Sequence, residues 1–406
     1  MKEKLNKNST IDLSTFAPGS RKSKREIIQT QELPSSTRIM VVGAGVFGGW
    51  TALQLLRKGY KVSLVDQWGP GNSQSSSGGE SRLIRAIYGD NRKYFDMTIQ
   101  AWEGWRELER VSNKKVLNNT GVLWLFHNEG RDTRKAISSI MDERDWPYEI
   151  LEGKAIPIRY PVIETGDLES VLIEKKAGYL LARHACQVVC DQFVQEGGNY
   201  EQAVIERGTP ASNRRMGILE SGVESMHDIV VFASGPWLPK IFPEILDSKL
   251  TVSRQEIHYF GIPAEHAGKF MDLPPWVDWE PGVFFYGIPS GDHRGFKVAC
   301  DIRGEDSDPS TMERIPQQEW VKRSREFLSR RFPLLERSPV IESRVCQYTN
   351  TRDGNFLLDR HPEYDNVWLL GGGSGHGFKH GPALGKLASE IISGNRQLDP
   401  DFVIPD

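Results

Sequence analysis

The sequence has little cysteine, almost no net charge, and no membrane-length apolar run that is free of glycine. Four cysteines among 406 residues are too few for a disulfide framework, so we expect a protein of a reducing compartment. The 51 Lys and Arg nearly balance the 54 Asp and Glu, which argues against nucleic-acid binding driven by overall charge. A hydrophobic fraction of 38% excludes collagen-like and wholly disordered chains. At roughly 150 residues per domain, the length suggests two or three domains.

Residues 39–56 are uncharged and are the stretch that could be mistaken for a membrane span. Glycines interrupt its middle and β-branched residues crowd its start, which favours a strand, a tight turn and a helix. Without a signal peptide or a C-terminal peroxisomal signal, the expected location is the cytoplasm, with no membrane or nucleic-acid partner. The polar segment 1–36, with its basic run 21–25, predicts a flexible tail; targeting or docking is the alternative.

From residue 38 onward, hydrophobic periodicity and glycine or proline stops predict an alternation of strands and helices. A nucleotide-binding βαβ pattern is suggested at the beginning, in the middle and at the end, with strand-rich stretches between. This pattern indicates a mixed α/β (α+β) fold of two interleaved domains. The expected strands are 39–42, 62–66, 121–126, 229–233, 252–262, 282–289, 296–302, 341–349 and 367–370, and the expected helices are 46–57, 95–108, 131–145, 183–195 and 384–393.

The sequence Gly43-Ala44-Gly45-Val46-Phe47-Gly48 follows a predicted strand and opens a predicted helix. Glycine lets the backbone turn tightly and approach a pyrophosphate, whose charge is then stabilised by the N-terminus of the helix. Asp66 ends the second predicted strand, where an acidic residue would bond a ribose hydroxyl. These features predict dinucleotide binding, and they leave NAD and FAD as alternatives.

Three further patterns have both a functional and a structural interpretation. Arg82 and Arg85 follow the Gly/Ser-rich segment 69–79 and could bind a carboxylate, although surface ion pairs are the alternative. The block 374–379 (SGHGFK) offers backbone N–H groups and Lys379 to an anion, or serves only as a turn into the last helix. The cysteines are predicted to pack in helices or strands: Cys186, Cys190, Cys300 and, from composition alone, Cys346; no metal site is expected.

Taken together, four segments resemble the monomeric sarcosine oxidase family. The resemblance extends to L-pipecolate oxidase and N-methyltryptophan oxidase, which belong with this family to the larger group of D-amino-acid-oxidase-like flavoproteins. The resemblance runs from about Arg38 to about Gly394. The segments are the strand–GAGVFG–helix start, SRLIRAIYG at 81–89, VFASGPW at 231–237, and VCQYTNTRDGNFLLDRHPEYDNVWLLGGGSGHGFKHG at 345–381.

The resemblance implies an FAD held covalently by Cys346 and a small amino acid substrate with a free carboxylate, oxidised with O2 by a monomeric enzyme. It places Arg82 over the flavin, and Arg85 and Lys379 at the substrate carboxylate. Tyr348 and His376 line the pocket, and Lys297 activates oxygen. The implied cofactor-binding residues are Gly43, Gly45, Val46, Phe47, Gly48, Asp66, Gln67, Ser81, Arg82, Ser234, Gly235, Trp237, Cys346, Gly373, Gly375, Gly377, Phe378 and Lys379. The expected Rossmann-like FAD domain comprises 37–94, 155–245 and 335–406, and the antiparallel-sheet substrate domain comprises 95–154 and 246–334.

Two departures from the family pattern bear on the substrate. Ser77-Gly78 stands where relatives carry paired histidines, and Asp301 stands where a histidine follows the oxygen-activating lysine. Glycine suggests a roomier pocket, and a carboxylate near the substrate could pair with a cation. The prediction is oxidation of a secondary or cyclic amino acid larger than sarcosine to an imine, with hydrogen peroxide as co-product. The alternatives are a dehydrogenase with a quinone or protein acceptor, a primary L-amino acid oxidase, and a flavin-bearing binding module.

Overall fold

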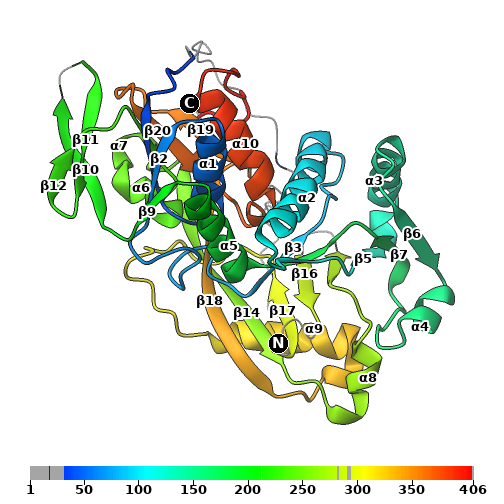
Figure 1. Cartoon of the computed structure of the whole chain (residues 1–406). Helices are drawn as coiled ribbons and strands as arrows, with labels where there is room; N and C mark the ends of the chain where they lie inside the picture. The colour runs from blue at the N-terminus through cyan, green and yellow to red at the C-terminus, as the bar shows by residue number, and fades with distance from the viewer. Residues whose placement is uncertain (1–17, 19–31, 212, 281–282, 290–293, 405–406) are drawn as a thin grey trace.

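Two large β-sheets organise the molecule, and the chain passes between them several times (Figure 1). The computed structural model describes residues 18, 32–211, 213–280, 283–289 and 294–404. The basic run 21–25 and most of the predicted tail lie outside these residues. Within the described residues, no helix is long and apolar enough to cross a membrane. The stretch 39–56 instead folds as a strand, a turn and a helix.

The first sheet has five parallel strands and one antiparallel edge strand. Alternate residues of its central strand face opposite sides, as the pleat requires. Ile39 and Val41 pack toward the helices, while Met40 and Val42 pack into a second apolar cluster. Its order is β19 (Leu357–Arg360), β20 (Val367–Gly371), β13 (Ile229–Phe232), β1 (Arg38–Val42), β2 (Lys61–Val65) and β9 (Asn199–Glu201).

Helices cover one face of this sheet. The helix α1 (Val46–Arg57) packs between α10 (Gly381–Ile392) and α5 (Ala182–Gln195), and α2 (Arg92–Ser112) packs against α10 (Figure 1). A protruding three-stranded sheet and two short helices lie toward the opposite side. These are β10 (Ile205–Ala211), β11 (Arg215–Glu220), β12 (Val223–Ser225), α6 (Leu238–Ile241) and α7 (Pro243–Leu246).

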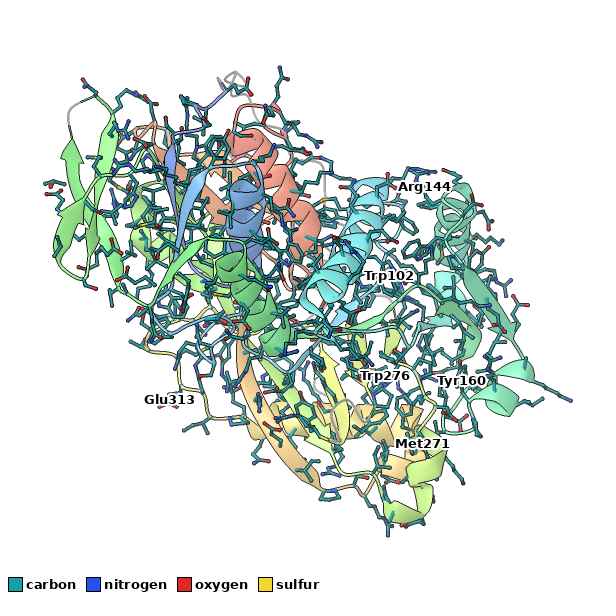
Figure 2. All side chains as sticks on the ribbon, in the orientation of Figure 1. Trp102, Arg144, Tyr160, Met271, Trp276 and Glu313 are labelled. Atoms are coloured by element: carbon teal, nitrogen blue, oxygen red, sulfur yellow. The ribbon has the colours of Figure 1, made fainter. Side chains whose placement is uncertain are left out.

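The second sheet has eight strands, and every neighbouring pair except β5 with β15 is antiparallel. Helix α9 (Gln318–Arg331) packs on it through Phe327 and Leu328, in the same apolar cluster as Trp276. Trp276 and Trp102, which lies in the helix-covered core, mark the two separate interiors (Figure 2). The order is β18 (Val340–Thr351), β14 (Leu250–Phe260), β17 (Phe296–Cys300), β16 (Val283–Ile288), β15 (Trp276–Glu280), β5 (Val122–His127), β7 (Leu168–Glu174) and β6 (Tyr148–Glu152).

A small antiparallel sheet also pairs segments that lie far apart in the sequence. Its order is β3 (Ser81–Ile84), β8 (Gly178–Leu181) and β4 (Leu117–Asn118). Because β3 follows the Gly/Ser-rich segment, this pairing fixes where Arg82 and Arg85 emerge. The remaining helices are α3 (Arg131–Glu143), α4 (Ala155–Arg159) and α8 (Ala267–Phe270).

The mixed α/β fold, with a Rossmann-like sheet beside an antiparallel sheet, is confirmed, and the predicted helix 46–57 matches α1. The expected elements were found within a few residues of their predicted ends, although Gly282 lies outside the described residues. Helix α9 and strand β7 were not predicted. Strands β7 and β18 both belong to the eight-stranded sheet, although both fall in segments assigned to the FAD domain. The domain boundaries stay a prediction.

Candidate active site

The turn after β1 is built by two glycines that accept no side chain. Gly43 has a φ of +108°, and a Cβ there would lie 2.5 Å from the carbonyl oxygen of Ala233. A Cβ at Gly48 would lie 1.9 Å from the carbonyl oxygen of Gly43. These contacts press the start of α1 against the strand ends. The N-terminus of α1 therefore faces the same space as the carboxyl ends of the parallel strands, which is where such sheets bind ligands.

Asp66 lies beside this turn, as predicted, and its carboxylate is already bonded to backbone N–H groups. Ala44 N donates to Oδ2 at 2.8 Å, and Trp68 N and Gly69 N donate to Oδ1 at 2.9 and 2.8 Å. Burial raises the pKa of Asp66, although these donors oppose the shift. Asp66 thus holds two loops together at the cavity wall. Its bond to a ribose stays a prediction.

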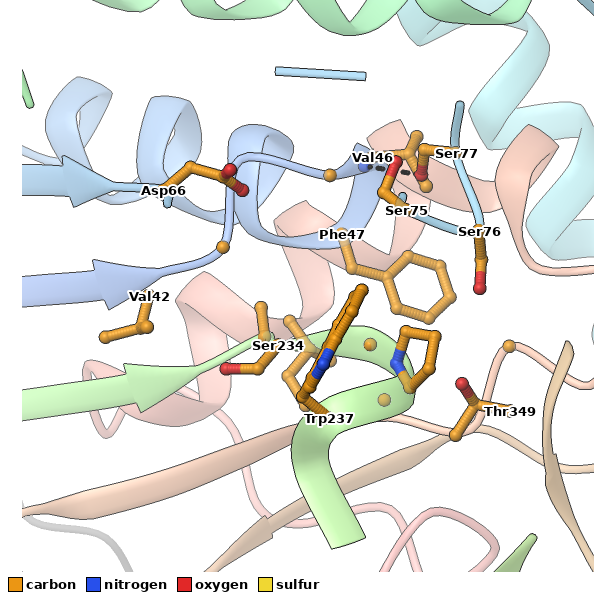
Figure 3. Close-up of a pocket in the computed structure, with 18 of the residues that line it drawn as sticks. Val42, Val46, Phe47, Asp66, Ser75, Ser76, Ser77, Ser234, Trp237 and Thr349 are labelled. Carbon is orange, nitrogen blue, oxygen red and sulfur yellow. Dashed lines mark hydrogen bonds between the residues drawn. The ribbon is translucent and has the colours of Figure 1, made fainter. Parts of the chain in front are cut away.

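A cavity of about 470 Å³ extends along the strand ends and the N-terminus of α1 (Figure 3). Most of the predicted cofactor-binding residues line it: Gly43, Gly45, Val46, Phe47, Asp66, Gln67, Arg82, Ser234, Gly235, Trp237, Gly373, Gly375, Gly377 and Phe378. Gly48 is not among its lining residues. Other lining residues were not among the predicted cofactor-binding residues, including Trp68, Asn72, Ser75 to Ser77, Ala203 to Glu206, Gln347 and Thr349.

The larger cavity suits a long polar cofactor. Four buried side-chain atoms on its wall have no hydrogen-bond partner among the described residues: the hydroxyls of Ser76, Ser234 and Thr349 and the Oε1 of Gln347. Buried polar groups without partners are rare in native proteins. Together with the open backbone at Gly45, where a Cβ would meet only Ser77 Oγ at 3.4 Å, they fit a bound dinucleotide. The residues present therefore fit FAD.

A smaller cavity of about 70 Å³ adjoins the larger one, because Arg82, Tyr348, Gly375 and Phe378 line both. The residues predicted for catalysis meet here from distant segments. The smaller cavity is lined by Ser81, Arg82, Arg85, Lys297, Asp301, Cys346, Tyr348, Gly375, His376, Phe378 and Lys379, together with Leu83, Gln255, Glu256, Ile257, Val277, Tyr286 and Cys300. The structure thus brings the predicted catalytic set into one place.

Arg85 and Lys379 form the cationic end of the smaller cavity. Arg85 is only 6% exposed, and its guanidinium lies 4.4 Å from the centroid of the Tyr88 ring. The alternative of a surface ion pair is therefore wrong for Arg85. The Nζ of Lys379 donates to the carbonyl of His376 at 3.1 Å and lies 4.6 Å from the Tyr88 centroid. Burial, and then the charge of Arg85, hold the pKa of Lys379 well below its usual value. Two crowded cations stabilise an anion placed between them.

Glu174 lies behind Arg85 and is fully buried. It accepts hydrogen bonds from Ala86 N at 2.6 Å and from the indoles of Trp124 and Trp146 at 3.1 Å each. Burial raises the pKa of Glu174, and the charge of Arg85 opposes that rise. This carboxylate therefore fixes the backbone that presents Arg85. It gave no signal in the sequence because β7 was itself not predicted.

Lys297 is buried on β17 beside the Gly/Ser-rich segment. Its Nζ donates to the carbonyl of Ser81 at 3.1 Å and lies 3.4 Å from Ser81 Oγ. Burial, and then the charge of Arg82, lower the pKa of Lys297 to about 7. Arg82 itself donates to the carbonyls of Ser76 and Ser81 at 2.8 and 2.9 Å. These contacts hold two cations at the junction of the two cavities.

His376 reaches the wall of the smaller cavity, but both ring nitrogens are bonded elsewhere. Its Nε2 donates to the carbonyl of Gly354 at 2.9 Å, and its Nδ1 lies 2.8 Å from the hydroxyl of Tyr88. The same hydroxyl lies 2.7 Å from Nε2 of His380. Burial, with the charge of Lys379, holds the pKa of His376 well below its usual value. His376 therefore orders the loop that carries Lys379; direct contact with a substrate stays a prediction.

Cys346 lies on β18 with its side chain half-buried at the wall of the smaller cavity. Its neighbours on both sides reach the Gly/Ser-rich segment: Gln347 Nε2 donates to the carbonyl of Gln74 at 2.7 Å, and Arg314 bridges the carbonyls of Val345 and Gln74 at 3.4 and 3.3 Å. Arg314, also missed in the sequence, has its pKa lowered by burial, while the nearby Cys346 opposes this.

The other cysteines behave as predicted. Cys186 and Cys190 lie on α5 and are buried in the apolar core, and Cys300 is buried on β17. Burial raises the pKa of each of these thiols to about 12. They are therefore poor nucleophiles and poor metal ligands at neutral pH.

Comparison with known proteins identifies the fold. Residues 38–391 match the DAO family, described as FAD dependent oxidoreductase. The chain belongs to this family. It is therefore an FAD-dependent oxidoreductase, and between NAD and FAD the cofactor is FAD.

Named relatives extend over nearly the whole chain. Monomeric sarcosine oxidase of Bacillus sp. (strain B-0618) is 28% identical over 368 residues, which cover 89% of this chain and 93% of the relative. Peroxisomal sarcosine oxidase of Homo sapiens is 28% identical over 377 residues, covering 89% of this chain and 93% of the relative. The predicted resemblance to sarcosine oxidases is confirmed.

Solved structures show the same architecture. L-proline dehydrogenase from P. horikoshii superposes with a TM-score of 0.78 at 18% identity, covering 90% of this chain and 95% of the other. At that identity the likeness establishes the fold of this FAD-dependent oxidoreductase and leaves its substrate open.

Proposed function

We propose that the protein oxidises a small amino acid with a free carboxylate, by removing hydride from the carbon that bears the amine. The observation that carries this proposal is the meeting of Arg85, Lys379 and Lys297 around one small cavity that adjoins the cofactor cavity. Bound FAD supplies the hydride acceptor and returns two electrons to oxygen, giving an imine and hydrogen peroxide. The proposed substrates are secondary or cyclic amino acids larger than sarcosine.

Substrate orientation is assigned to Arg85 and Lys379. A guanidinium donates two parallel hydrogen bonds to a carboxylate, and the ammonium adds a point charge. Both groups are buried, so a bound carboxylate interacts with them more strongly than it would in water. A substrate held at its carboxylate presents a fixed face of its α-carbon, which makes hydride transfer effectively intramolecular.

Covalent attachment of FAD is assigned to Cys346. This residue is the half-buried cysteine of the chain, whereas Cys186, Cys190 and Cys300 are buried. It lines the smaller cavity beside Arg82 and Tyr348, which line both cavities. A thiol at this junction is placed to bond the ring end of a dinucleotide that fills the larger cavity.

The test is a panel of amino acids, including N-methylated, cyclic, cationic and primary members, assayed for peroxide release in air. We expect a subset to release peroxide in proportion to substrate consumed. Substrate oxidation with an artificial quinone but without peroxide would contradict oxidase activity and favour a dehydrogenase. Absence of flavin reduction by every amino acid in anaerobic solution would contradict the proposed donor class.

Replacing Arg85 with Met tests the carboxylate site. We expect KM for the active amino acid to rise by about 100-fold, because a buried charge-assisted pair contributes roughly 3 kcal/mol. Arg106→Met, at an exposed position of α2, is the matched control and should leave KM unchanged. An unchanged KM in Arg85→Met would remove Arg85 from the site.

A further inference from the structure

Asp301 lines the smaller cavity, and the cationic side chains that line the same cavity form no ion pair with it. Asp301 follows the last residue of β17, and its backbone N–H donates to the carbonyl of Phe284 at 2.7 Å. The strand ladder therefore continues to Asp301 and fixes its position. Its carboxylate lines the same small cavity as Tyr348, whose hydroxyl lowers the pKa of Asp301. Among the described residues it forms no ion pair within 4.0 Å.

Cations nevertheless lie close enough to act on Asp301. Burial raises its pKa to about 6, and the charges of Arg85, Arg303 and Lys379 oppose that rise. At neutral pH the carboxylate of Asp301 is therefore mostly ionised. No cation in the described part of the chain forms an ion pair with it. The titratable and charged groups that act on it are Arg85, Arg303, Lys379, Tyr348 and Tyr286.

At one part of the cavity wall, Arg85 and Lys379 thus lie near Asp301 without forming an ion pair with it. An α-amino acid has the complementary arrangement, because its carboxylate and its ammonium are separated by one carbon. The cavity measures only about 70 Å³, so Asp301 and the cations assigned to the carboxylate share a small space. The α-nitrogen, one carbon from the carboxylate, fits such a space.

We propose that Asp301 is the counter-ion of the substrate nitrogen and restricts the substrate class to amino acids that enter as zwitterions. The inference rests on the proposed function, in which Arg85 and Lys379 hold the carboxylate. Asp301 pairs with the ammonium on binding; the ammonium then gives one proton to the Asp301 carboxylate, and the freed lone pair forms the C=N bond as hydride leaves carbon. N-acylated amino acids and simple carboxylic acids, whose α-substituent carries no charge, are excluded.

Two ligands of equal shape test the proposal by binding alone. Glycine betaine and tert-butylacetate both offer a carboxylate, and they differ only in a positive nitrogen against a neutral carbon. Betaine has no lone pair on nitrogen and cannot be oxidised. Dissociation constants for the FAD-loaded protein are measured by calorimetry or by the change in flavin absorbance. Glycine and propanoate form a smaller pair, measured as competitive inhibitors.

We expect the wild type to bind the cationic member about tenfold more tightly, which corresponds to about 1.4 kcal/mol. The preference should decrease below pH 6 as Asp301 becomes protonated. Protonation of Lys379 affects both members equally, so it cancels in the ratio. Asp301→Asn should abolish the preference while retaining affinity for the neutral member, and Asp301→Glu should restore part of it. Asp272→Asn, at an exposed position, is the control and should change neither constant.

Equal affinities for both pairs in the wild type, or an undiminished preference in Asp301→Asn, would overturn the proposal. The readout does not depend on turnover. Absence of amino acid oxidation with an intact betaine preference would refute the proposed function while leaving the role of Asp301 in place. Peroxide release without any preference would refute the role of Asp301 alone.

Discussion

At the scale of single residues, the site works because burial changes the chemistry of ordinary side chains. Lys297 and Lys379 are 2% and 3% exposed, and both have pKa values lowered by desolvation and by neighbouring cations. Each is therefore poised to gain a proton when an anion arrives, because an opposite charge favours the charged form. Surface lysines would remain charged throughout and would be screened by salt.

Lys297→Met tests the proposed role of this lysine with oxygen. In the proposed reaction, the oxygen-consuming half passes through superoxide, an anion that a buried cation stabilises. We expect its rate constant to fall by at least about 100-fold, the range typical of a lost electrostatic stabiliser, while anaerobic substrate oxidation changes little. Stopped-flow measurement of the two halves separates them. Equal losses in both would contradict the assignment.

The pKa of Lys297 also predicts a pH dependence. In the proposed role, the charged form of Lys297 is the active one, and it is lost as pH rises through about 7. The rate constant for reaction of the reduced wild-type enzyme with oxygen should therefore decline above neutral pH. The midpoint should lie at or above 7, because a negative charge near Lys297 favours its ammonium form. Lys297→Met should show no such decline.

At the scale of elements, the cofactor cavity depends on the join between β1 and α1. Gly48 is the first-turn residue of α1 that is pressed against the carbonyl of Gly43. The contact is with a backbone carbonyl rather than with the end of a flexible side chain, so the turn between β1 and α1 has no room to relax. The position of the α1 N-terminus therefore depends on the absence of a single methyl group.

Gly48→Ala should reduce FAD content strongly and lower the free energy of unfolding by about 1–3 kcal/mol, as overpacking does. Flavin absorbance of the purified protein and denaturant unfolding measure the two effects. Gly268→Ala in α8 is the control, because a Cβ there would meet nothing within 4 Å. Full FAD content in Gly48→Ala would contradict this prediction, because it would show that the backbone of the turn can shift to accept the added methyl group.

Helix α9 is attached to the eight-stranded sheet by a buried ionic network. Arg331 is fully buried, and its Nε donates to Asp278 Oδ2 at 2.6 Å. Its guanidinium also bonds Asp167 Oδ1 at 2.8 Å, and His127 Nε2 lies 2.7 Å from Asp278 Oδ1. The network lies on the side of the sheet that carries α9 and takes no part in lining either cavity.

Arg331→Met should lower the free energy of unfolding by about 3–5 kcal/mol, because it removes the guanidinium from the buried Asp278 and leaves this carboxylate only its contact with His127. FAD content and KM should remain near wild type. Arg323→Met, which breaks an exposed pair with Glu319 on the same helix, should cost only about 0.3–0.5 kcal/mol. Equal destabilisation by both variants would contradict the importance of the buried network.

At the scale of the whole molecule, β18 connects the two sheets and both cavities. It pairs with β14 along its length, and the chain then enters β19 of the other sheet. The backbone N–H of Ser374 donates to the carbonyl of Thr349 at 2.8 Å, which ties the C-terminal glycine loop to this strand. Cys346 on β18 is thereby held where segments from both ends of the chain converge.

Cys346→Ser tests the covalent tether. Wild-type protein precipitated with acid should remain yellow, whereas the variant should release its FAD into the supernatant. The variant should still fold and bind FAD reversibly, because the other cavity contacts persist. Cys300→Ala, which alters another cysteine of the same wall, should keep the bound colour. A yellow precipitate from Cys346→Ser would place the attachment elsewhere.

The sequence was sufficient for features that depend on neighbouring residues. The turn at Gly43 and Gly48 follows from backbone sterics within six residues, and the helix 46–57 follows from local periodicity. Helix α9 was missed because its buried face includes Ser324 and Arg331, which interrupt the apolar pattern. Strand β7 was missed because its apolar run, Val171–Ile173, is only three residues long and lies between Glu169 and Glu174.

Only the tertiary structure decided which distant groups meet. Tyr88 bonds His376 and His380 across nearly 300 residues of chain, so no local pattern could show that the ring of His376 is already engaged. The family resemblance proposed that the cations converge, and the fold brought them to one cavity. Burial, which lowers the pKa of Lys297 and raises that of Asp301, arises from the packing of both sheets. The sequence determines the type of each residue, but the fold determines how far water reaches its side chain, and so its pKa.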